Sequence, residues 1–238
     1  MKLSINIIFT ILCIILFIAL LKKDIFGSTT WRYRIFDLNS KKKITKIAND
    51  IWVVDNFYLR PDLIIEFYKN RFYNQRKALY STKYYNPELI KFKELIEFLE
   101  SLILKQISYS QWNDHVFTNS NGFFQYILKD NQVSLHTDTA TNYGIVVYLD
   151  KNPILNKGTS FYKHKKSGDE IRNIKKEYEV WEEGENPQFD KWQKIYSVNN
   201  YFNRAVIFNS QRFHCSDGGY GDNKYNSRFF QTYFFNTI

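Results

Sequence analysis

The spacing of apolar and polar residues changes twice along the 238-residue chain. After an uncharged apolar run at residues 3–21, two segments that begin at Pro61 and Pro87 repeat their apolar residues at helical spacing. In both, an acidic residue follows the proline, which is typical of a helix start. After Gly122 the apolar residues gather in short β-branched and aromatic runs, which are typical of strands. Helices followed by a series of strands predict an α+β fold in which N-terminal helices support a barrel or sandwich.

The predicted strands lie mainly in the second half of the chain, and most are bounded by Gly, Asn, Asp or Pro. They cover residues 51–58, 123–128, 144–149, 159–162, 205–208 and 229–235. Residues 165–195 interrupt the series, because they are charged and lack a clear period. We interpret them as an insertion between strands.

The apolar run at residues 3–21 predicts a membrane anchor. As a helix at about 1.5 Å per residue, it would reach roughly 28 Å, close to the hydrocarbon thickness of a bilayer. Its length, with Lys22 and Lys23 directly behind it, favours a retained single-pass anchor over a cleaved signal peptide. More basic residues follow the run than precede it, so the positive-inside rule places the large domain in the cytoplasm. The expected organisation is a transmembrane anchor over 1–23, a juxtamembrane linker over 24–46 and one domain over 47–238.

The composition disfavours nucleic acid as a binding partner and indicates an ordered domain without a disulfide. The formal net charge is +9, but the basic residues are scattered and only Lys41–Lys43 form a run, which disfavours nucleic-acid binding. Aromatic residues make up 18% of the chain, which indicates a well-packed, strand-rich globule rather than disorder. Cys13 lies in the apolar run and Cys215 beside a histidine, so no structural disulfide is expected between them.

A histidine and an aspartate two residues apart, His136 and Asp138, are candidate metal ligands. In a strand, residues i and i+2 point to the same face, so both side chains can reach one ion. His214 follows 76 residues after Asp138 and can add a second imidazole. Two imidazoles and one carboxylate hold one face of a ferrous ion in non-haem iron oxygenases and leave the other face open. By itself, a histidine two residues before an aspartate is weak evidence for a metal site, because a histidine more often has a structural role in which it is hydrogen-bonded.

The segments after Asp138 give this pair a context. In chain order they are an apolar strand, a Gly-Thr-x-Phe strand, an apolar strand that ends six residues before His214, and a last strand entered at Arg228. Over residues 120–235 the series resembles the Fe(II)- and 2-oxoglutarate-dependent dioxygenase superfamily, including its prolyl-hydroxylase-like members. It is most similar to an uncharacterised branch of that superfamily with Phe-Tyr-x-His and Asn-Arg-x-Val-x-Phe signatures.

The resemblance implies a fold, a cofactor and its ligands. The fold would be a double-stranded β-helix, or jelly-roll, with iron inside its mouth. His136, Asp138 and His214 would bind Fe(II), and Arg228 would pair with the distal carboxylate of 2-oxoglutarate through its planar fork. Arg228 lies 14 residues beyond His214, further than the basic residue commonly lies in the superfamily.

Other residues compete for, or add to, the co-substrate site. Arg204 and Arg212 are the alternatives to Arg228, although both are interpreted more simply as structural or surface residues. By resemblance, Tyr126 and Thr159 would contact 2-oxoglutarate; the alternatives are a core aromatic residue and a turn residue. His164 is kept outside the triad.

The implied activity is that of an enzyme, a membrane-anchored dioxygenase. It would consume O2 and 2-oxoglutarate, release succinate and CO2, and hydroxylate a substrate. Two alternatives stay open: a non-catalytic binding module on the same scaffold, and a cupin-like metalloenzyme that does not use 2-oxoglutarate. The sequence does not choose among a protein side chain, a lipid and a small metabolite as substrate.

Overall fold

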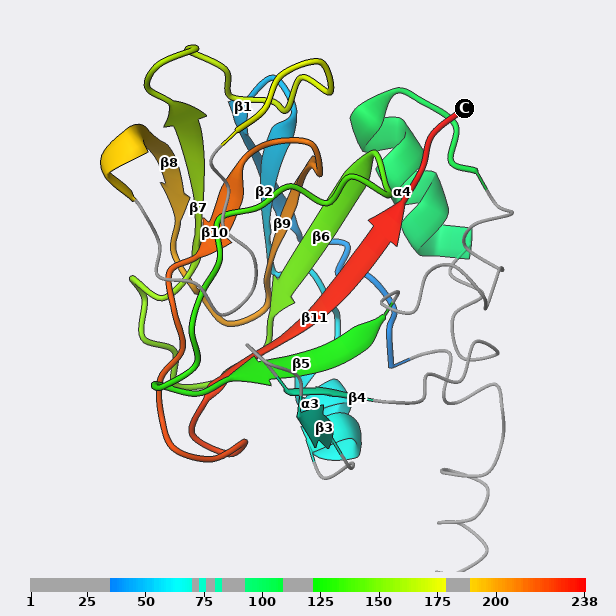
Figure 1. Cartoon of the computed structure of the whole chain (residues 1–238). Coiled ribbons are helices and arrows are strands. Elements are labelled where there is room, and N and C mark those ends of the chain that lie inside the picture. Colours follow the sequence, from blue (N-terminus) through cyan, green and yellow to red (C-terminus); the bar gives the residue numbers. More distant parts are fainter. Residues whose placement is uncertain (1–34, 70–72, 76–79, 83–92, 109–121, 179–188) are drawn as a thin grey trace, which may run out of the picture.

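The computed structural model describes residues 35–69, 73–75, 80–82, 93–108, 122–178 and 189–238 (Figure 1). Two antiparallel sheets dominate it. The large sheet has eight strands in the order β1-β2-β9-β6-β11-β5-β4-β3, and the small sheet has three in the order β10-β7-β8. The large sheet consists of β1 Lys43–Ala48, β2 Ile51–Asp55, β9 Arg204–Asn209, β6 Tyr143–Tyr148, β11 Arg228–Phe235, β5 Phe123–Ile127, β4 Tyr80–Thr82 and β3 Tyr73–Gln75. The small sheet consists of β10 His214–Ser216, β7 Thr159–His164 and β8 Trp192–Val198.

One further segment extends the small sheet at the free edge of β10. His136 forms a β-bridge with His214, with reciprocal backbone hydrogen bonds of 3.0 Å. The segment around His136 therefore runs along β10, although only a single bridge joins them.

The two faces of the large sheet bury different sets of residues because side chains alternate along each strand. On one face, residues such as Ile145, Ile207 and Tyr233 pack with the helices α3 (Pro61–Lys69) and α4 (Lys93–Ile103), and we call this set the helix-side core. On the other face, residues such as Tyr148 and Phe208 meet Phe161 and Val198 of the small sheet, and we call this set the inter-sheet core.

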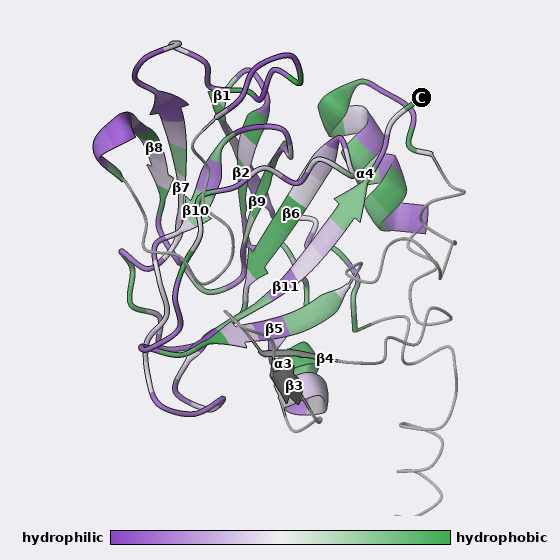
Figure 2. Ribbon diagram, in the orientation of Figure 1, coloured by the Kyte–Doolittle hydropathy of each residue, from purple (hydrophilic) through white to green (hydrophobic). Residues whose placement is uncertain are grey.

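The hydropathy of the elements follows this layering. Figure 2 shows the central strands of the large sheet as mainly hydrophobic and α4 as hydrophobic on one side and hydrophilic on the other. The buried residues of α4 are Leu95, Ile96, Leu99 and Ile103, which recur at helical spacing. A third, smaller group packs on the outer face of the small sheet; this outer cluster contains Leu135, Tyr162, Trp192, Phe213 and Cys215.

The predicted fold class is wrong. The described chain is mainly β, with two α-helices of 9 and 11 residues, and neither is long and apolar enough to cross a bilayer. Residues 3–21, on which the predicted anchor rested, lie outside the described residues. The described strands establish two antiparallel sheets; a closed double-stranded β-helix is not established.

Two strands, β1 and β8, begin where the sequence pattern predicted no strand. β1 begins inside the expected linker 24–46, and residues 192–195 of the expected insertion belong to β8. β1 is largely exposed at the edge of the large sheet, and β8 alternates irregularly between exposed and buried positions. Such strands lack the regular apolar alternation by which a half-buried strand is recognised.

Candidate metal centre

The structure brings His136, Asp138 and His214 together at the edge of the small sheet. Each offers one ligand atom, and these three atoms lie within 4.8 Å of one another. Nε2 of His214 is 3.3 Å from one carboxylate oxygen of Asp138, and Nε2 of His136 is 3.7 Å from the other. The two imidazole centroids are 4.4 Å apart. The predicted ligand residues therefore converge on a volume that one metal ion can fill.

Backbone pairing positions the three side chains. The His136–His214 bridge aligns the two histidines across neighbouring segments. The amide of Asp138 donates to the carbonyl of Ser210 at 2.8 Å, and Nε2 of Gln211 donates to the carbonyl of Asp138 at 3.2 Å. Asp138 is thus tied to the turn that leads into His214, so residues distant in sequence hold a fixed relative position.

Both imidazoles are oriented by backbone carbonyls. Nδ1 of His136 donates to the carbonyl of Ser134 at 3.0 Å, and Nδ1 of His214 donates to the carbonyl of Arg212 at 2.8 Å. A carbonyl oxygen can only accept, so this contact places the proton on Nδ1 and leaves Nε2 of a neutral ring as an acceptor. When both rings are neutral, these two nitrogens and the carboxylate face one another without a donor hydrogen between them. A divalent cation satisfies all three, which is the arrangement expected of metal-binding histidines.

The electrostatics of Asp138 suit a metal ligand. Burial raises the pKa of its carboxyl, but when the imidazoles are protonated, the hydrogen bond from His214 and the charges of His214 and His136 outweigh that effect, so the pKa lies below its ordinary value of 3.8. The carboxylate is therefore ionised at neutral pH and available as an anionic ligand.

The centre is closed on one side and open on the other. The His214 side chain is 7% exposed and packs edge-on against Phe208, with ring centroids 4.7 Å apart. The side chains of Asp138 and His136 are 27% and 43% exposed. Three protein ligands with an accessible outer side are typical of a catalytic rather than a purely structural metal site.

Arg228 lies on the same face of the large sheet as the inter-sheet core and is 2% exposed. Its Nε donates to the carbonyl of Lys157 at 2.7 Å, and its terminal nitrogens donate to the carbonyl of Gly158 and to Oγ of Ser216, each at 3.0 Å. The guanidinium carbon is 4.7 Å from the centroid of the Phe230 ring. Among the described residues, no carboxylate forms an ion pair with Arg228, so a buried positive charge stands without an anionic partner there.

Tyr148, which the sequence pattern did not single out, lies between Thr159 and this arginine and contacts both. The hydroxyl of Tyr148 donates to Oγ1 of Thr159 at 2.7 Å, and the Tyr148 ring centroid is 5.4 Å from the Arg228 guanidinium carbon. Burial raises the pKa of Tyr148, although Arg228 and Thr159 act in the opposite direction, so its hydroxyl stays a donor at neutral pH. The one signal for Tyr148 in the sequence was a polar tip in an otherwise apolar strand.

Tyr126 is not brought to this site. It pairs with Phe229 on β11, and both belong to the helix-side core, whereas Arg228 faces the small sheet. Tyr126 therefore packs as a core aromatic residue on the opposite face of the sheet from Arg228.

The competing arginines both have acidic partners. Arg204 forms a two-pronged ion pair with Asp55, and Arg212 pairs with Asp50 and Glu170. His164 packs against Trp192, with ring centroids 4.9 Å apart, on the outer side of the small sheet. The structure thus leaves Arg228 as the arginine without a carboxylate partner among these three.

Comparison with known proteins places the chain in a family. It belongs to DUF6445, a family of unknown function. The match covers residues 39–220, and no curated protein matches the chain. The part shared with DUF6445 includes His136, Asp138 and His214, whereas Arg228 lies beyond it.

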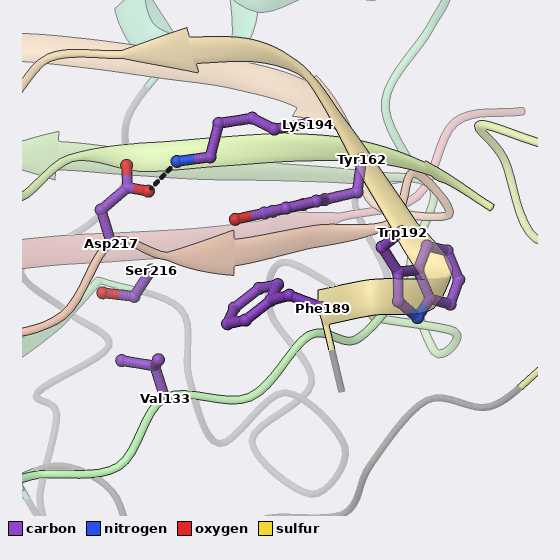
Figure 3. Close-up of a pocket in the computed structure, with 7 residues that line it drawn as sticks. All are labelled: Val133, Tyr162, Phe189, Trp192, Lys194, Ser216 and Asp217. Atoms are coloured by element: carbon purple, nitrogen blue, oxygen red, sulfur yellow. Dashed lines mark hydrogen bonds and ion pairs between the residues drawn. The ribbon is translucent and has the colours of Figure 1, made fainter. Parts of the chain in front are cut away.

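A separate cavity of about 430 Å³ lies within the same DUF6445 region, on the outer side of the small sheet. Figure 3 shows aromatic rings along it and an ion pair of Lys194 with Asp217 at one end. The seven residues around it are Val133, Tyr162, Phe189, Trp192, Lys194, Ser216 and Asp217. None of them is a triad residue. Tyr162 and Trp192 belong to the outer cluster, whereas His214 packs on the inter-sheet side, so this cavity does not hold the triad. Ser216, which accepts a hydrogen bond from Arg228, lines the cavity as well.

Proposed function

We propose that this chain is an Fe(II)- and 2-oxoglutarate-dependent dioxygenase that hydroxylates a substrate and releases succinate and CO2. The observation that carries the proposal is the convergence of two imidazole nitrogens, each freed by a carbonyl contact at Nδ1, and the ionised carboxylate of Asp138. The resemblance of the strand series around these residues to that superfamily supports the same assignment.

The donor set favours a ferrous ion over a structural zinc ion. Two histidines and one carboxylate on one face, with open positions opposite, are typical of ferrous oxygenases, whereas structural zinc sites use four closed ligands. When bound, Fe(II) would supply the redox chemistry that couples O2 and 2-oxoglutarate to substrate hydroxylation. The protein would hold the ion through His136, Asp138 and His214. Backbone carbonyls orient the two imidazole rings, and the backbone of Asp138 is held by Ser210 and Gln211.

Arg228 would bind the distal carboxylate of 2-oxoglutarate. Its guanidinium has five N–H donors, and three are used by the carbonyls of Lys157 and Gly158 and by Ser216. A buried cation without a carboxylate partner among the described residues favours an anionic ligand, because an isolated buried charge is destabilising. The bonds already formed fix the plane of the guanidinium, so binding would require little reorganisation.

The position of Arg228 relative to the ligands suits such a co-substrate. His214 and Ser216 are two residues apart on β10 and point to the same face, which separates them by roughly 7 Å along the strand. Ser216 accepts a hydrogen bond from Arg228. A five-carbon dicarboxylate is long enough to reach from the metal to this end of the strand. Thr159 and Tyr148 would add hydroxyl groups beside the same carboxylate.

The test is anaerobic titration of the metal-free full-length protein with Fe(II), followed by titration with 2-oxoglutarate and a turnover assay for succinate. We expect binding of one Fe(II), binding of 2-oxoglutarate only in its presence, and succinate formation once O2 is admitted. His136→Ala and Asp138→Ala should abolish these signals, and His164→Ala is the matched control that should retain them. Fe(II) binding without any affinity for 2-oxoglutarate would instead indicate a cupin-like metalloenzyme, and absence of Fe(II) binding a non-catalytic module.

A further inference from the structure

Arg212 lies two residues before His214 and joins this part of the chain to two other parts. Its side chain is 8% exposed. Its Nε lies 2.6 Å from a carboxylate oxygen of Asp50, in the turn between β1 and β2. One of its terminal nitrogens lies 2.8 Å from a carboxylate oxygen of Glu170, in the segment that follows β7. A buried arginine with two carboxylate partners is held much more firmly than a surface arginine.

The segment that contains Glu170 also pairs with the backbone around Arg212. The amide of Phe213 donates to the carbonyl of Glu170 at 3.1 Å, and the amide of Arg172 donates to the carbonyl of Gln211 at 2.8 Å. Ile171 forms a β-bridge with Arg212. The first part of the expected insertion therefore lies against the approach to the metal centre and is fixed to it by both backbone and side chain.

The backbone of Arg212 in turn determines the orientation of the His214 ring. Its carbonyl accepts the hydrogen bond from Nδ1 of His214 at 2.8 Å, which sets the tautomer and the ring plane. The preceding residue, Gln211, donates from its side chain to the carbonyl of Asp138 at 3.2 Å. Two of the three ligand residues thus take their orientation from the turn that Arg212 anchors.

We propose that Arg212, held between Asp50 and Glu170, is a positioning residue of the metal centre: it fixes the carbonyl that orients His214 for metal binding. The inference rests on the proposed metal site but adds to it, since it assigns a role to the segment around Glu170 and to the β1–β2 turn. Neither acidic residue is among the ligands. Their removal should therefore weaken metal binding without removing a donor atom.

The chain contains a matched control at the other end of β9. Arg204 begins this strand and forms a two-pronged ion pair with Asp55, at 2.6 and 3.0 Å, whereas Arg212 follows the strand and pairs with Asp50. Asp50 directly precedes β2, and Asp55 is its last residue. Asp50→Asn and Asp55→Asn therefore each remove a carboxylate that pairs one end of β2 with an arginine at one end of β9. Only Asp50→Asn acts next to His214.

The experiment uses the full-length, metal-free protein titrated with Co(II), whose visible spectrum reports the ligand geometry. Outer contacts of metal-binding histidines typically change affinity by about 10- to 100-fold, so we expect that loss for Asp50→Asn and Glu170→Gln, together with a changed Co(II) spectrum. Asp55→Asn, and Asp169→Asn beside Glu170, should change affinity by less than about 3-fold even where their Tm falls. Arg212→Lys keeps the charge but lacks the planar fork, so it should give an intermediate loss.

The outcomes separate the two proposals. Equal Co(II) affinity of Asp50→Asn and Asp55→Asn, both folded by circular dichroism, would overturn the positioning role. If Asp50→Asn does not fold, Glu170→Gln against Asp169→Asn decides the question. Co(II) binding with the expected ranking but no turnover of 2-oxoglutarate would refute the dioxygenase and leave the positioning role standing. Absence of Co(II) binding by the wild type would overturn both.

Discussion

The buried guanidinium of Arg228 allows a test that needs no knowledge of the substrate. Arg228→Met keeps an unbranched side chain but removes three hydrogen bonds, to the carbonyls of Lys157 and Gly158 and to Ser216. The Ser216 hydroxyl can rotate, whereas the two carbonyls lose a buried donor. An unpaired buried polar group costs about 1–3 kcal/mol, and relief of the buried charge offsets part of this. We therefore expect the free energy of unfolding to fall by about 2–4 kcal/mol.

Arg204→Met is the matched control for this measurement. Arg204 also starts a strand of the large sheet, but its side chain is 17% exposed and that of its partner Asp55 is 32% exposed. An ion pair this open to solvent contributes about 1 kcal/mol or less. Urea unfolding followed by circular dichroism should show the larger shift of the midpoint for Arg228→Met, with an unchanged slope for both variants.

The same protein tests the co-substrate role. With Mn(II) in the metal site and 2-oxoglutarate at about 100 times its Kd, a ligand that binds only the folded state adds about 2.7 kcal/mol to the free energy of unfolding. Wild type and Arg204→Met should gain this increment, whereas Arg228→Lys should lose most of it because a lysine cannot make the two-pronged contact. A full 2-oxoglutarate increment in Arg228→Lys would refute the assignment, and a change below about 1 kcal/mol for Arg228→Met would refute the account of its hydrogen bonds.

Three further predictions concern stability. Burial, followed by the nearby negative charge of Asp217, raises the pKa of the Cys215 thiol from 9.0 to about 12. The unfolded thiol therefore ionises first, and the free energy of unfolding should fall as pH rises from 9 toward 12; near pH 10 wild type should lose about 1 kcal/mol more than Cys215→Ala. A Cβ at Gly158 would overlap the backbone carbonyl of Val198, whereas nothing lies within 4 Å of a Cβ at Gly168, whose φ is +75°. Thermal unfolding should show a loss of about 3 kcal/mol or more for Gly158→Ala and about 1 kcal/mol for Gly168→Ala, and equal losses would contradict the packing argument. Tyr58→Phe removes the hydroxyl that bonds Gln231 at 2.8 Å inside the helix-side core, so urea unfolding should show a loss of about 1–3 kcal/mol.

The candidate ligands could be predicted from the sequence because their chemistry is local. Alternation along an extended segment was enough to predict that His136 and Asp138 share a face, and His214 was recognised by its place after an apolar strand. The central strands of the large sheet could also be predicted, since they carry continuous β-branched and aromatic runs between Gly and Asn residues. Each of these inferences depends on a few neighbouring residues.

Features that depend on register could not be predicted in this way. Tyr126 pairs with Phe229, so it shares the face of Phe229 and not that of Arg228 one residue earlier. A shift by one residue would exchange the two faces, and nothing in the sequence of β5 alone determines that shift. The roles of Tyr148 and Ser216 depend in the same way on which strand lies opposite. The two expected helices are present as α3 and α4, whereas β1 was missed for the related reason that such an edge strand carries little apolar pattern.

The shortness of β10 explains why so many contacts gather around the candidate centre. The strand has three residues, yet it carries both the candidate ligand His214 and Ser216, the contact of Arg228. Three residues form too few ladder hydrogen bonds to fix their own position, so the ends must be held from outside. Arg212 holds one end through two carboxylates, and Arg228 holds the other through Ser216. Because the two arginines act at opposite ends, loss of either should misplace a different part of the site: loss of Arg212 should weaken metal binding, and loss of Arg228 should weaken 2-oxoglutarate binding while Co(II) affinity is kept.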